Sequence, residues 1–554
     1  MLYGFGMRST MMPMPLQVSR ILRHGSTVHA GSEVVTWTGT PGASRRATFA
    51  DVGRTAARLA NALRDDLGVT GDQRVATLMW NNSEHLATYL AAPSMGAVLH
   101  TLNLRLIPDQ IAYIANHAED KVVIVSDTLI PLLAKVLPLV STVEHVVVVG
   151  DGDTAALEGG SATVHRWNEL LDGRSDRFDW PDVDENDAAA LCYTSGTTGH
   201  PKGVAYSHRS IYLHSMQVCM AETFGLSPAT RELCIVPMFH AMAWGLPYAA
   251  FMSGASLVMT ERFLQADHIA EMIATEKPNL AGAVPTIFGD LLRHIDSHPT
   301  DTSSLKEVII GGSACPPALM HALSERHGIE VIHAWGMTET SPLGSVARPP
   351  AHLSRDQAWA YRYTQGRTPA SVEARIVGPA GDVMPNDGKS VGELEVRGPW
   401  VTGRYIGDDA EQPDPEKFRD GWLRTGDVGR LSPDGFLTLT DRAKDVIKSG
   451  GEWISSLELE NFLMEHPAVA EACVVAVPDD KWGERPLASV VLTEGQTTTA
   501  AELKEFLSAK VARWQLPERW AFIEAVPKTS VGKYNKKELQ SHYADGALTV
   551  EEVR

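Results

Sequence analysis

Cysteine, long apolar runs and positive charge are all scarce in this chain of 554 residues, and each shortage excludes a class of protein. The five cysteines are an odd number without metal-ligand spacing, which is typical of small buried side chains in a reducing compartment. No stretch reaches the roughly 18 uninterrupted apolar residues of a membrane span. The Met-rich N-terminus lacks the compact apolar block of a signal peptide. We therefore expect a cytoplasmic protein without a transmembrane segment.

Acidic residues outnumber basic ones, with 68 Asp and Glu against 49 Lys and Arg and a net charge of −19. A surface of that sign repels phosphate backbones, so nucleic acid is not expected as a partner. A small anionic ligand is still compatible with the sequence, because a local group of basic side chains can outweigh the mean charge.

Short apolar runs alternate with longer amphipathic segments over the first two-thirds of the chain. This alternation is typical of an α/β architecture with largely parallel sheets. We expect buried strands at 74–78, 122–125, 145–149, 308–310 and 331–334, and helices at 49–67 and 264–276.

The pattern changes near residue 370. Residues 374–439 hold short runs separated by turn signals such as Ser432-Pro-Asp-Gly435, which predicts antiparallel strands. The segment 440–444 is expected to be the linker that follows this part. We expect an N-terminal domain at 1–440 and a hinge at 441–445.

The last part of the chain, 446–554, is expected to be a small α+β domain of about the minimum independent size. Ser455-Ser-Leu-Glu458 predicts a capping box at the start of a helix that ends before Pro467. A strand at 469–477 and a helix at 500–511 follow.

A Gly- and Thr-rich segment, Tyr193-Thr-Ser-Gly-Thr-Thr-Gly-His-Pro-Lys-Gly203, follows an apolar run. Its three glycines let backbone N–H groups approach a ligand, its hydroxyls add donors and Lys202 adds charge, which together predict a phosphate cradle. The spacing differs from the Walker loop, because Lys202 precedes a glycine rather than Ser or Thr. The candidate phosphate-binding residues are Thr194, Ser195, Gly196, Thr197, Thr198, Gly199 and Lys202.

Four further motifs resemble those of one family when they are taken with this loop in their order along the chain. The family is the adenylate-forming superfamily of acyl-CoA synthetases, luciferases and peptide-synthetase adenylation domains. The resemblance covers about residues 45 to 540. It implies a large N-terminal domain of α/β subdomains with a small β-barrel-like subdomain, and a small mobile α+β C-terminal domain. The motifs are Trp335-Gly-Met-Thr-Glu-Thr340, Arg424-Thr-Gly-Asp427, Asp441-Arg-Ala-Lys-Asp445 and Pro527-Lys-Thr-Ser-Val-Gly-Lys533.

The resemblance implies an ATP site at the carboxyl ends of the strands, where open α/β sheets bind ligands. Trp335 stands where the family has tyrosine, so its π-face would still stack on adenine while a phenol hydrogen bond is lost. Asp427 would accept hydrogen bonds from the ribose hydroxyls, and Arg442 would hold the ribose from the hinge side. The other residues assigned to ATP in this way are Gly312, Ser313, Gly336 and Thr338.

The same resemblance assigns Glu339 to Mg²⁺, with Thr338 beside it on the phosphate. A carboxylate oxygen suits a hard cation that bridges phosphates and keeps several waters. Taken alone, Glu339 is a solvated loop carboxylate. Lys533 would bridge the acyl carboxylate and the α-phosphate, where charge builds in the transition state; taken alone, it belongs to a solvated basic run. The implied catalytic residues are Lys533, Thr338, Glu339 and Lys202, with Glu339 and Thr338 at the metal.

The implied reaction has two steps. A carboxylate attacks the α-phosphorus of ATP and releases pyrophosphate, and a thiolate of coenzyme A then attacks the acyl carbon and releases AMP. Because Lys533 must leave before the thiol enters, the small domain is expected to turn about a hinge at Lys444. Gly450, Gly451 and Trp453 would then face the site and bind coenzyme A, although the same segment is also a turn before a capped helix.

The segment Pro237-Met-Phe-His-Ala-Met-Ala-Trp244 is expected to select the acid. Amino-acid-activating relatives place an aspartate after the phenylalanine, and here that position is His240, so an amino acid is not expected. Similarity to medium- and long-chain fatty acyl-CoA synthetases implies a fatty acid, with Trp244 gating the acyl tunnel. The alternative for Trp244 is ordinary core packing.

We therefore predict an ATP-dependent fatty acid:CoA ligase for medium to long chains, with ATP, Mg²⁺ and coenzyme A as ligands. The alternatives are a CoA ligase for an aryl or short thioether acid, an acyl-AMP ligase that delivers to a carrier protein, and a non-catalytic sensor. Lys533 disfavours the sensor, because binding alone does not require the C-terminal lysine. The resemblance also leaves a homodimer open.

Overall fold

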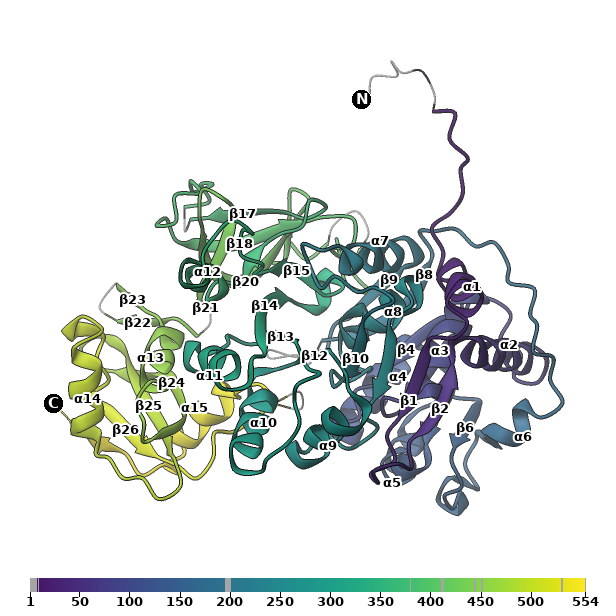
Figure 1. Cartoon of the computed structure of the whole chain (residues 1–554), viewed down its shortest axis with the longest axis horizontal. Coiled ribbons are helices and arrows are strands. Elements are labelled where there is room, and N and C mark those ends of the chain that lie inside the picture. The colour runs from purple at the N-terminus through teal and green to yellow at the C-terminus, as the bar shows by residue number, and fades with distance from the viewer. Residues whose placement is uncertain are drawn as a thin grey trace.

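The computed structural model describes residues 7, 9–194, 201–378, 380–409, 413–442, 445–449, 452–529 and 532–553. For Lys448, Glu452 and Trp453 it describes the backbone alone. Figure 1 shows a large N-terminal region, coloured purple to green, with a smaller yellow-green C-terminal lobe at one end.

The first sheet of the N-terminal region is parallel except at one edge, where its last two strands are antiparallel. Its central strands are apolar almost throughout, as parallel strands covered on both faces require. In spatial order the strands are β7 (Thr163–Arg166), β6 (His145–Val149), β5 (Asp120–Ser126), β3 (Arg74–Leu78), β4 (Val98–Thr101), β8 (Ala188–Tyr193) and β9 (Gly203–Ser207).

The second sheet begins as a parallel sheet with one antiparallel edge strand. Its parallel strands all end at the face of the molecule where the chain turns into the predicted site segments, as expected for a ligand-binding edge. In spatial order this part consists of β2 (Arg45–Thr48), β1 (Glu33–Thr36), β11 (Ser256–Met259), β10 (Arg231–Cys234), β12 (Leu280–Ala283), β13 (Glu307–Ile310) and β14 (Glu330–Gly336).

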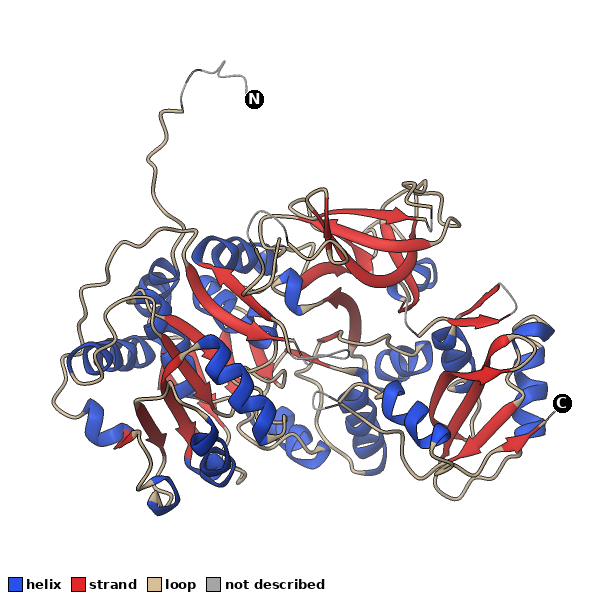
Figure 2. Cartoon of the chain, turned by 180° about the vertical axis from the view of Figure 1, so that it is seen from behind, coloured by secondary structure: helices blue, strands red, loops and turns tan. Residues whose placement is uncertain are grey.

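Beyond β14 the same sheet continues as antiparallel strands, which Figure 2 shows as a strongly curved layer at the top of the view. This curved part corresponds to the predicted β-barrel-like subdomain. Its strands are β15 (Leu343–Val346), β16 (Gly366–Arg367), β21 (Phe436–Arg442), β20 (Trp422–Leu431), β18 (Gly392–Arg397) and β17 (Glu373–Val377), with β19 (Phe418–Arg419) paired to β20.

Helices cover the two parallel sheets. The longest, α2 (Phe49–Asp65), begins where the Thr48 and Asp51 side chains cap each other's backbone N–H groups, as in a capping box. The others in this region are α1 (Val18–Val28), α3 (Ser83–Ser94), α4 (Pro108–Ala118), α5 (Ile130–Val136), α6 (Trp167–Leu171), α7 (His208–Cys219), α8 (Leu246–Ser253), α9 (Ala266–Glu276), α10 (Pro285–Ser297), α11 (Pro317–His327) and α12 (Arg355–Arg362).

The C-terminal lobe is a small α+β unit, as predicted. Its sheet consists of β23 (Glu452–Ile454), β22 (Ile447–Ser449), β25 (Gly483–Leu492), β26 (Arg519–Phe522) and β27 (Glu551–Glu552), with β24 (Val469–Asp479) paired to β25. The helices that pack on it are α13 (Ser456–Leu463), α14 (Ala500–Ser508) and α15 (Lys536–Ala544).

The buried apolar side chains also separate the N-terminal region from the C-terminal lobe. One continuous cluster joins the first sheet, through Val75 and Leu99, to the second sheet, through Leu257 and Ile309. The C-terminal lobe has its own clusters, one of them centred on Trp520. The N-terminal region is therefore one packed body, and the lobe is a second one with an independent core.

The strands and helices expected from the sequence are confirmed, with small differences at their ends. The helix expected at 49–67 ends at Asp65, the one at 264–276 begins at Ala266, and the one at 500–511 ends at Ser508. Strand β21 continues through Asp441 and Arg442 because they pair with Val428 and Asp427 of β20. The first two residues of the expected hinge at 441–445 therefore belong to a strand.

In the described part of the chain, no helix combines the length and apolar character that crossing a bilayer requires.

Candidate active site

A cavity of about 550 Å³ opens where the parallel strands of the N-terminal region end. Most residues predicted for ATP, metal and acid line it, although they come from segments far apart in sequence. The C-terminal lobe contributes its lysine to the same space. The predicted residues on the cavity wall are Thr194, Lys202, His240, Trp244, Gly312, Trp335, Gly336, Thr338, Glu339, Arg442 and Lys533.

Two hydrogen bonds between Thr194 and Lys202 close the base of the Gly/Thr loop. The Thr194 N–H donates to the Lys202 carbonyl over 2.9 Å, and the Lys202 N–H donates to the Thr194 hydroxyl over 3.2 Å. The loop therefore connects the antiparallel strands β8 and β9 at the cavity rim. Ser195, Gly196, Thr197, Thr198 and Gly199 lie outside the described residues, so their assignment to phosphate stays a prediction.

The Lys202 side chain is held from two sides. Its Nζ lies 3.1 Å from Asp414 Oδ2 and 4.8 Å from the centre of the Tyr405 ring. The hydrogen bond from Lys202 lowers the pKa of Asp414 below its ordinary value. A phosphate group arriving at Lys202 would compete with the Asp414 carboxylate for the same ammonium.

The buried Asp427 carboxylate is held by two donors. Trp335 Nε1–H donates to Oδ2 over 2.8 Å, and Arg442 Nε lies 3.1 Å from Oδ1. The pairing of β20 with β21 sets this contact, because Asp427 and Arg442 are opposite each other. The Trp335 indole thus makes a hydrogen bond that sequence reasoning missed. Each Asp427 oxygen keeps a further lone pair for a ribose hydroxyl.

The turn after β13 brings backbone to the cavity wall. Gly312 has φ +82°, and Lys533 Cε lies 3.2 Å from the place that a side-chain carbon would take there. Glycine is therefore favoured by the left-handed backbone conformation, and its lack of a side chain leaves room for the lysine beside it. Gly311 also lines the cavity, whereas Ser313 is exposed and is not part of its lining.

Glu339 lies in a single 3₁₀ turn, Thr338–Thr340, directly after β14. Its side chain is 6% exposed, and its Oε1 accepts a hydrogen bond of 2.6 Å from the Tyr405 hydroxyl. The Thr338 carbonyl accepts another, 2.7 Å long, from the Tyr206 hydroxyl. Tyrosines therefore fix both residues that the sequence assigns to metal and phosphate.

The donor set around Glu339 fits Mg²⁺. Among the described residues, no group of three or more His, Cys, Asp or Glu side chains could hold a metal ion. A single carboxylate is nevertheless a normal protein ligand for Mg²⁺, which takes its remaining ligands from phosphate oxygens and water. A metal with a dedicated all-protein cage does not fit here.

Lys533 reaches the cavity from the C-terminal lobe. The Thr286 hydroxyl at the start of α10 donates to the Gly532 carbonyl over 3.1 Å and docks the lysine loop on the N-terminal region. Burial, with a contribution from the Arg442 charge, lowers the pKa of Lys533 to about 8. The lysine of the C-terminal lobe thus lies in the same cavity as the residues predicted for ATP and the acid.

The segment that is expected to select the acid ends in an unusual backbone conformation. Residues 241–244 have φ of 44°, 56°, 50° and 57°, and Gly245 has φ 72°, so five residues in a row are left-handed. Left-handed L-residues cost about 1–2 kcal/mol each. Such strain occurs where surrounding structure fixes it, which is common at ligand sites.

This turn sets the Trp244 indole against two backbones. The ring lies 3.4 Å from the side-chain position of Gly282 on β12 and 3.3 Å from that of Gly311. His240, at the start of the turn, faces the cavity. Burial, together with the Lys533 charge, lowers the pKa of His240 to about 3, so the imidazole is neutral near pH 7.

The two lobes also meet beside the predicted hinge. Asp441 Oδ2, at the end of β21, accepts bonds of 2.7 and 2.6 Å from the Ser456 N–H and hydroxyl. Lys536 Nζ lies 2.5 Å from the same hydroxyl and 2.8 Å from Glu460 Oε1. Lys444, Gly450, Gly451 and the Trp453 side chain lie outside the described residues.

Tyr405 and Asp414 were not found from the sequence. Both contact predicted residues that are far away in the chain, Glu339 at a separation of 66 positions and Lys202 at 212. The segment that carries them has no motif-like composition, so no local signal could have identified them.

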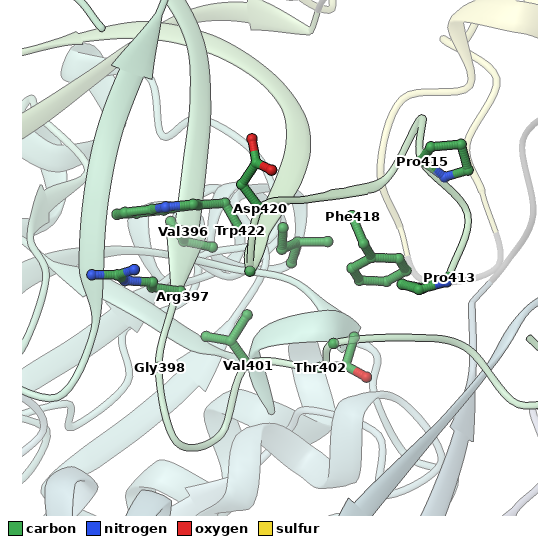
Figure 3. Close-up of a pocket in the computed structure, with 13 residues that line it drawn as sticks. Val396, Arg397, Gly398, Val401, Thr402, Pro413, Pro415, Phe418, Asp420 and Trp422 are labelled. Carbon is green, nitrogen blue, oxygen red and sulfur yellow. The ribbon is translucent and has the colours of Figure 1, made fainter. Parts of the chain in front are cut away.

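A second cavity, of about 700 Å³, lies on the curved antiparallel part of the second sheet (Figure 3). Arg397 stacks on the Trp422 ring, 4.4 Å from its centre, and is also paired with Glu373. Phe418 forms another part of the wall and packs edge-to-face on Tyr405. The two cavities are therefore neighbours, because Phe418 of the second cavity packs on Tyr405 of the candidate active site.

Comparison with known proteins bears on this geometry. The family model "AMP-binding enzyme" matches residues 22–406, and the model "AMP-binding enzyme C-terminal domain" matches residues 458–533. The chain is 42% identical to a 3-methylmercaptopropionyl-CoA ligase of Ruegeria lacuscaerulensis, and the match covers 98% of this chain and 100% of that protein. It is also 42% identical to a medium-chain-fatty-acid–CoA ligase of Ectopseudomonas oleovorans, over 97% of this chain and 98% of that protein. The identity to a long-chain-fatty-acid–CoA ligase of Thermus thermophilus is 42% as well, over 97% of each chain.

Solved structures show the same architecture. An anthranilate CoA ligase in complex with anthranoyl-AMP superposes with a TM-score of 0.86 at 26% identity, covering 98% of this chain and all of that one. An ATP-bound MatB from Rhodopseudomonas palustris superposes with a TM-score of 0.82 at 25% identity, over 96% and 99% of the two chains. The chain belongs to the AMP-binding enzyme family and, within it, to the acyl-CoA ligases.

Proposed function

We propose that this acyl-CoA ligase activates a fatty acid of medium to long chain with ATP and transfers it to coenzyme A. The observation that carries the proposal is the meeting of Lys533, Glu339 and Lys202 with the Trp244 pocket in one cavity. A charge-stabilising lysine, a metal-binding carboxylate and an apolar pocket are the parts that acyl-adenylate formation needs.

In the first step the acid carboxylate attacks the α-phosphorus of ATP, forms the mixed anhydride and releases pyrophosphate. Lys533 is proposed to stabilise the charge that develops on the α-phosphate oxygens. Lys202 holds the terminal phosphates, and Asp427 with Arg442 holds the ribose. Mg²⁺, held by Glu339 beside Thr338, neutralises phosphate charge when bound.

In the second step the thiolate of coenzyme A attacks the acyl carbon and AMP leaves. Lys533 lies in the cavity that the thiol of coenzyme A would have to enter. The C-terminal lobe is therefore proposed to turn between the two steps. We place the pivot at Lys444, between the end of β21 and β22, with the domains before and after it. Gly450, Gly451 and Trp453 are proposed to face the thiol arm after the turn.

The proposed acid has an uncharged, apolar tail. The proposed acyl pocket consists of the apolar lining residues Phe224, Ala241, Trp244 and Leu343 together with the neutral His240. A substrate ammonium would find no carboxylate among these five. The relatives that are named medium- and long-chain fatty acid ligases support the same class of acid.

A short thioether acid is the second candidate, and one observation favours it. The Trp244 indole lines the cavity and packs against Gly282 and Gly311, so we propose that it limits the depth of the pocket in this conformation. A tail that ends at the indole would need no movement of the strained turn. The relative named 3-methylmercaptopropionyl-CoA ligase supports this candidate to the same degree as the fatty acid ligases support the first.

The experiment is a panel of carboxylates: 3-methylthiopropionate, butyrate, hexanoate, octanoate, palmitate and benzoate. Release of AMP is measured for each acid with and without coenzyme A. For a fatty acid ligase, apparent affinity should rise severalfold per added methylene, since each can contribute up to about 0.8 kcal/mol, until the pocket is full. A maximum at 3-methylthiopropionate would select the second candidate, and a maximum at benzoate would contradict both.

A further inference from the structure

Tyr405 lies at the junction of the two candidate phosphate-binding elements. It is 5% exposed, in the irregular segment between β18 and β19. Its neighbour Ile406 donates a backbone hydrogen bond of 2.8 Å to Gly203, at the start of β9. The Thr402 N–H donates one of 2.8 Å to the Glu339 carbonyl. The segment is therefore attached both to the loop that carries Lys202 and to the turn that carries Glu339.

The phenol hydroxyl fixes the Glu339 side chain. It donates to Oε1 over 2.6 Å, a short bond typical of an ionised acceptor. Burial raises the pKa of Tyr405 well above its ordinary value, so the hydroxyl stays a donor at any working pH. One carboxylate oxygen is thus occupied by Tyr405, and the carboxylate is oriented for a cation at the other.

The ring of the same residue holds Lys202. The ammonium lies 4.8 Å from the ring centre, which is cation–π distance. The ring itself is fixed by Phe418, whose ring centre lies 5.4 Å away in an edge-to-face arrangement, and by a 3.1 Å bond from the Tyr405 N–H to Asp408. The hydroxyl and the ring of Tyr405 therefore have different partners, and substitutions can remove one contact without the other.

We propose that Tyr405 is a positioning residue for the nucleotide: its hydroxyl orients Glu339 for Mg²⁺, and its ring face places Lys202 for the phosphates. This inference rests on the proposed function, because it assigns Glu339 and Lys202 to Mg²⁺ and ATP. Residues that orient a metal-ligating carboxylate commonly change metal affinity by about 10–100-fold when they are removed.

The test compares Tyr405→Phe with Tyr405→Leu. Binding of ATP is measured by titration calorimetry with and without Mg²⁺, and acid-dependent pyrophosphate release is measured over a range of Mg²⁺ concentrations. In Tyr405→Phe the Mg²⁺ concentration for half-saturation should rise by about 10–100-fold, while ATP binding without Mg²⁺ stays within about twofold. In Tyr405→Leu, which also loses the ring, ATP binding without Mg²⁺ should fall as well, by about threefold to fivefold.

The matched control is Tyr363→Phe, which removes a hydroxyl that bonds His321 on the surface, away from the cavity. It should match the wild type in every measurement. An unchanged Mg²⁺ dependence in Tyr405→Phe would overturn the proposal, and so would an equal loss of ATP binding with and without Mg²⁺. If Tyr405→Leu fails to fold by its melting curve, the Phe variant still decides.

The outcome is separate from that of the proposed function. If the wild type forms no pyrophosphate with any acid, the ligase assignment fails before Tyr405 is considered. If the wild type is active and Tyr405→Phe has the normal Mg²⁺ requirement, only the role of Tyr405 fails.

Discussion

The two sides of the candidate active site are held in place in different ways. The N-terminal side consists of turns at the ends of β13, β14 and β10, which share one continuous core with both sheets. The C-terminal side consists of one loop that carries Lys533 and is docked by the bond between Thr286 and Gly532. Its lobe has an independent core and is further attached through Asp441 and Ser456.

In the proposed mechanism, this difference separates the groups that serve both half-reactions from a group that serves only the first. Side chains set in a shared core cannot leave without unfolding their neighbours, and Trp335 and Trp244 are of this kind. A group held by a few polar contacts between two bodies can be withdrawn at the cost of those contacts. Substitutions on the two sides should therefore have different kinetic signatures.

The largest effect is expected for Lys533→Ala. Loss of a charge-stabilising group should slow adenylate formation by about 10²–10³-fold, as for other preorganised groups of this kind. Thioester formation from supplied acyl-adenylate and coenzyme A should stay near the wild-type rate, because in the proposed mechanism the lysine is withdrawn in that step. The measurements are acid-dependent pyrophosphate release and single-turnover thioester formation.

Lys528→Ala is the control for this variant, since Lys528 pairs with Glu471 outside the cavity. It should leave both half-reactions unchanged. Equal losses in both half-reactions of Lys533→Ala would contradict the division between a fixed and a removable side.

On the fixed side, Trp244→Ala should act on stability and chain length. Removing a large side chain that is 8% exposed should lower the free energy of unfolding by about 3–5 kcal/mol. If the indole bounds the acyl pocket, the preferred acid should become longer, while the affinity for ATP and the balance of the half-reactions stay unchanged. Melting curves and the acid panel measure the two effects.

Trp482→Ala, which removes an exposed indole, is the control for this variant. An unchanged length profile in Trp244→Ala, together with the loss of stability, would show that Trp244 is ordinary core packing.

Asp441→Asn tests the contact between the lobes. The carboxylate accepts two hydrogen bonds from Ser456, and the amide of Asn loses the charge that strengthens them. We expect adenylate formation to slow by about tenfold, equivalent to roughly 1.4 kcal/mol of weakened charge-assisted bonding. Thioester formation from supplied acyl-adenylate should be as fast as in the wild type or faster.

Asp434→Asn, in an exposed turn before β21, is the matched control. If Asp441→Asn slows both half-reactions equally, Asp441 does not act through the orientation of the lobe.

The smallest expected effect is a pH dependence on the removable side. With the pKa of Lys533 near 8, the ammonium is lost as pH rises through that value. The kcat/KM of adenylate formation should therefore fall by about eightfold between pH 7.5 and 9. His240, with a pKa near 3, is neutral throughout this range and does not contribute. A profile of the same shape in Lys533→Ala would assign the pH dependence to another group.

The fixed side was largely predictable from the sequence, because its residues follow buried strands directly. Gly312 follows β13, and Trp335, Gly336 and Glu339 lie at or after the end of β14, so locating the strands located the residues. The hydrogen bond from Trp335 to Asp427 was not predictable, since it joins positions 92 apart through the pairing of distant strands. Tyr405 was missed for the same reason.

The conformation of residues 241–244 was not predictable either. Left-handed backbone is normally signalled by glycine or asparagine, and only Gly245 in this run is of that kind. Tertiary packing of Trp244 against two glycine backbones overrides the local preference, and the sequence around residue 240 contains no trace of it.

This left-handed turn has a consequence for selection experiments on stability. Alanine-to-glycine changes in buried segments are usually lost from a library of stabilised variants, because glycine gains more entropy on unfolding. At positions 241 and 243 the order should be reversed, since glycine removes steric repulsion of about 1–2 kcal/mol at each left-handed alanine. Enrichment of Ala241→Gly and Ala243→Gly among heat-resistant clones would reveal how much stability this chain gives up to keep its acyl pocket in this shape.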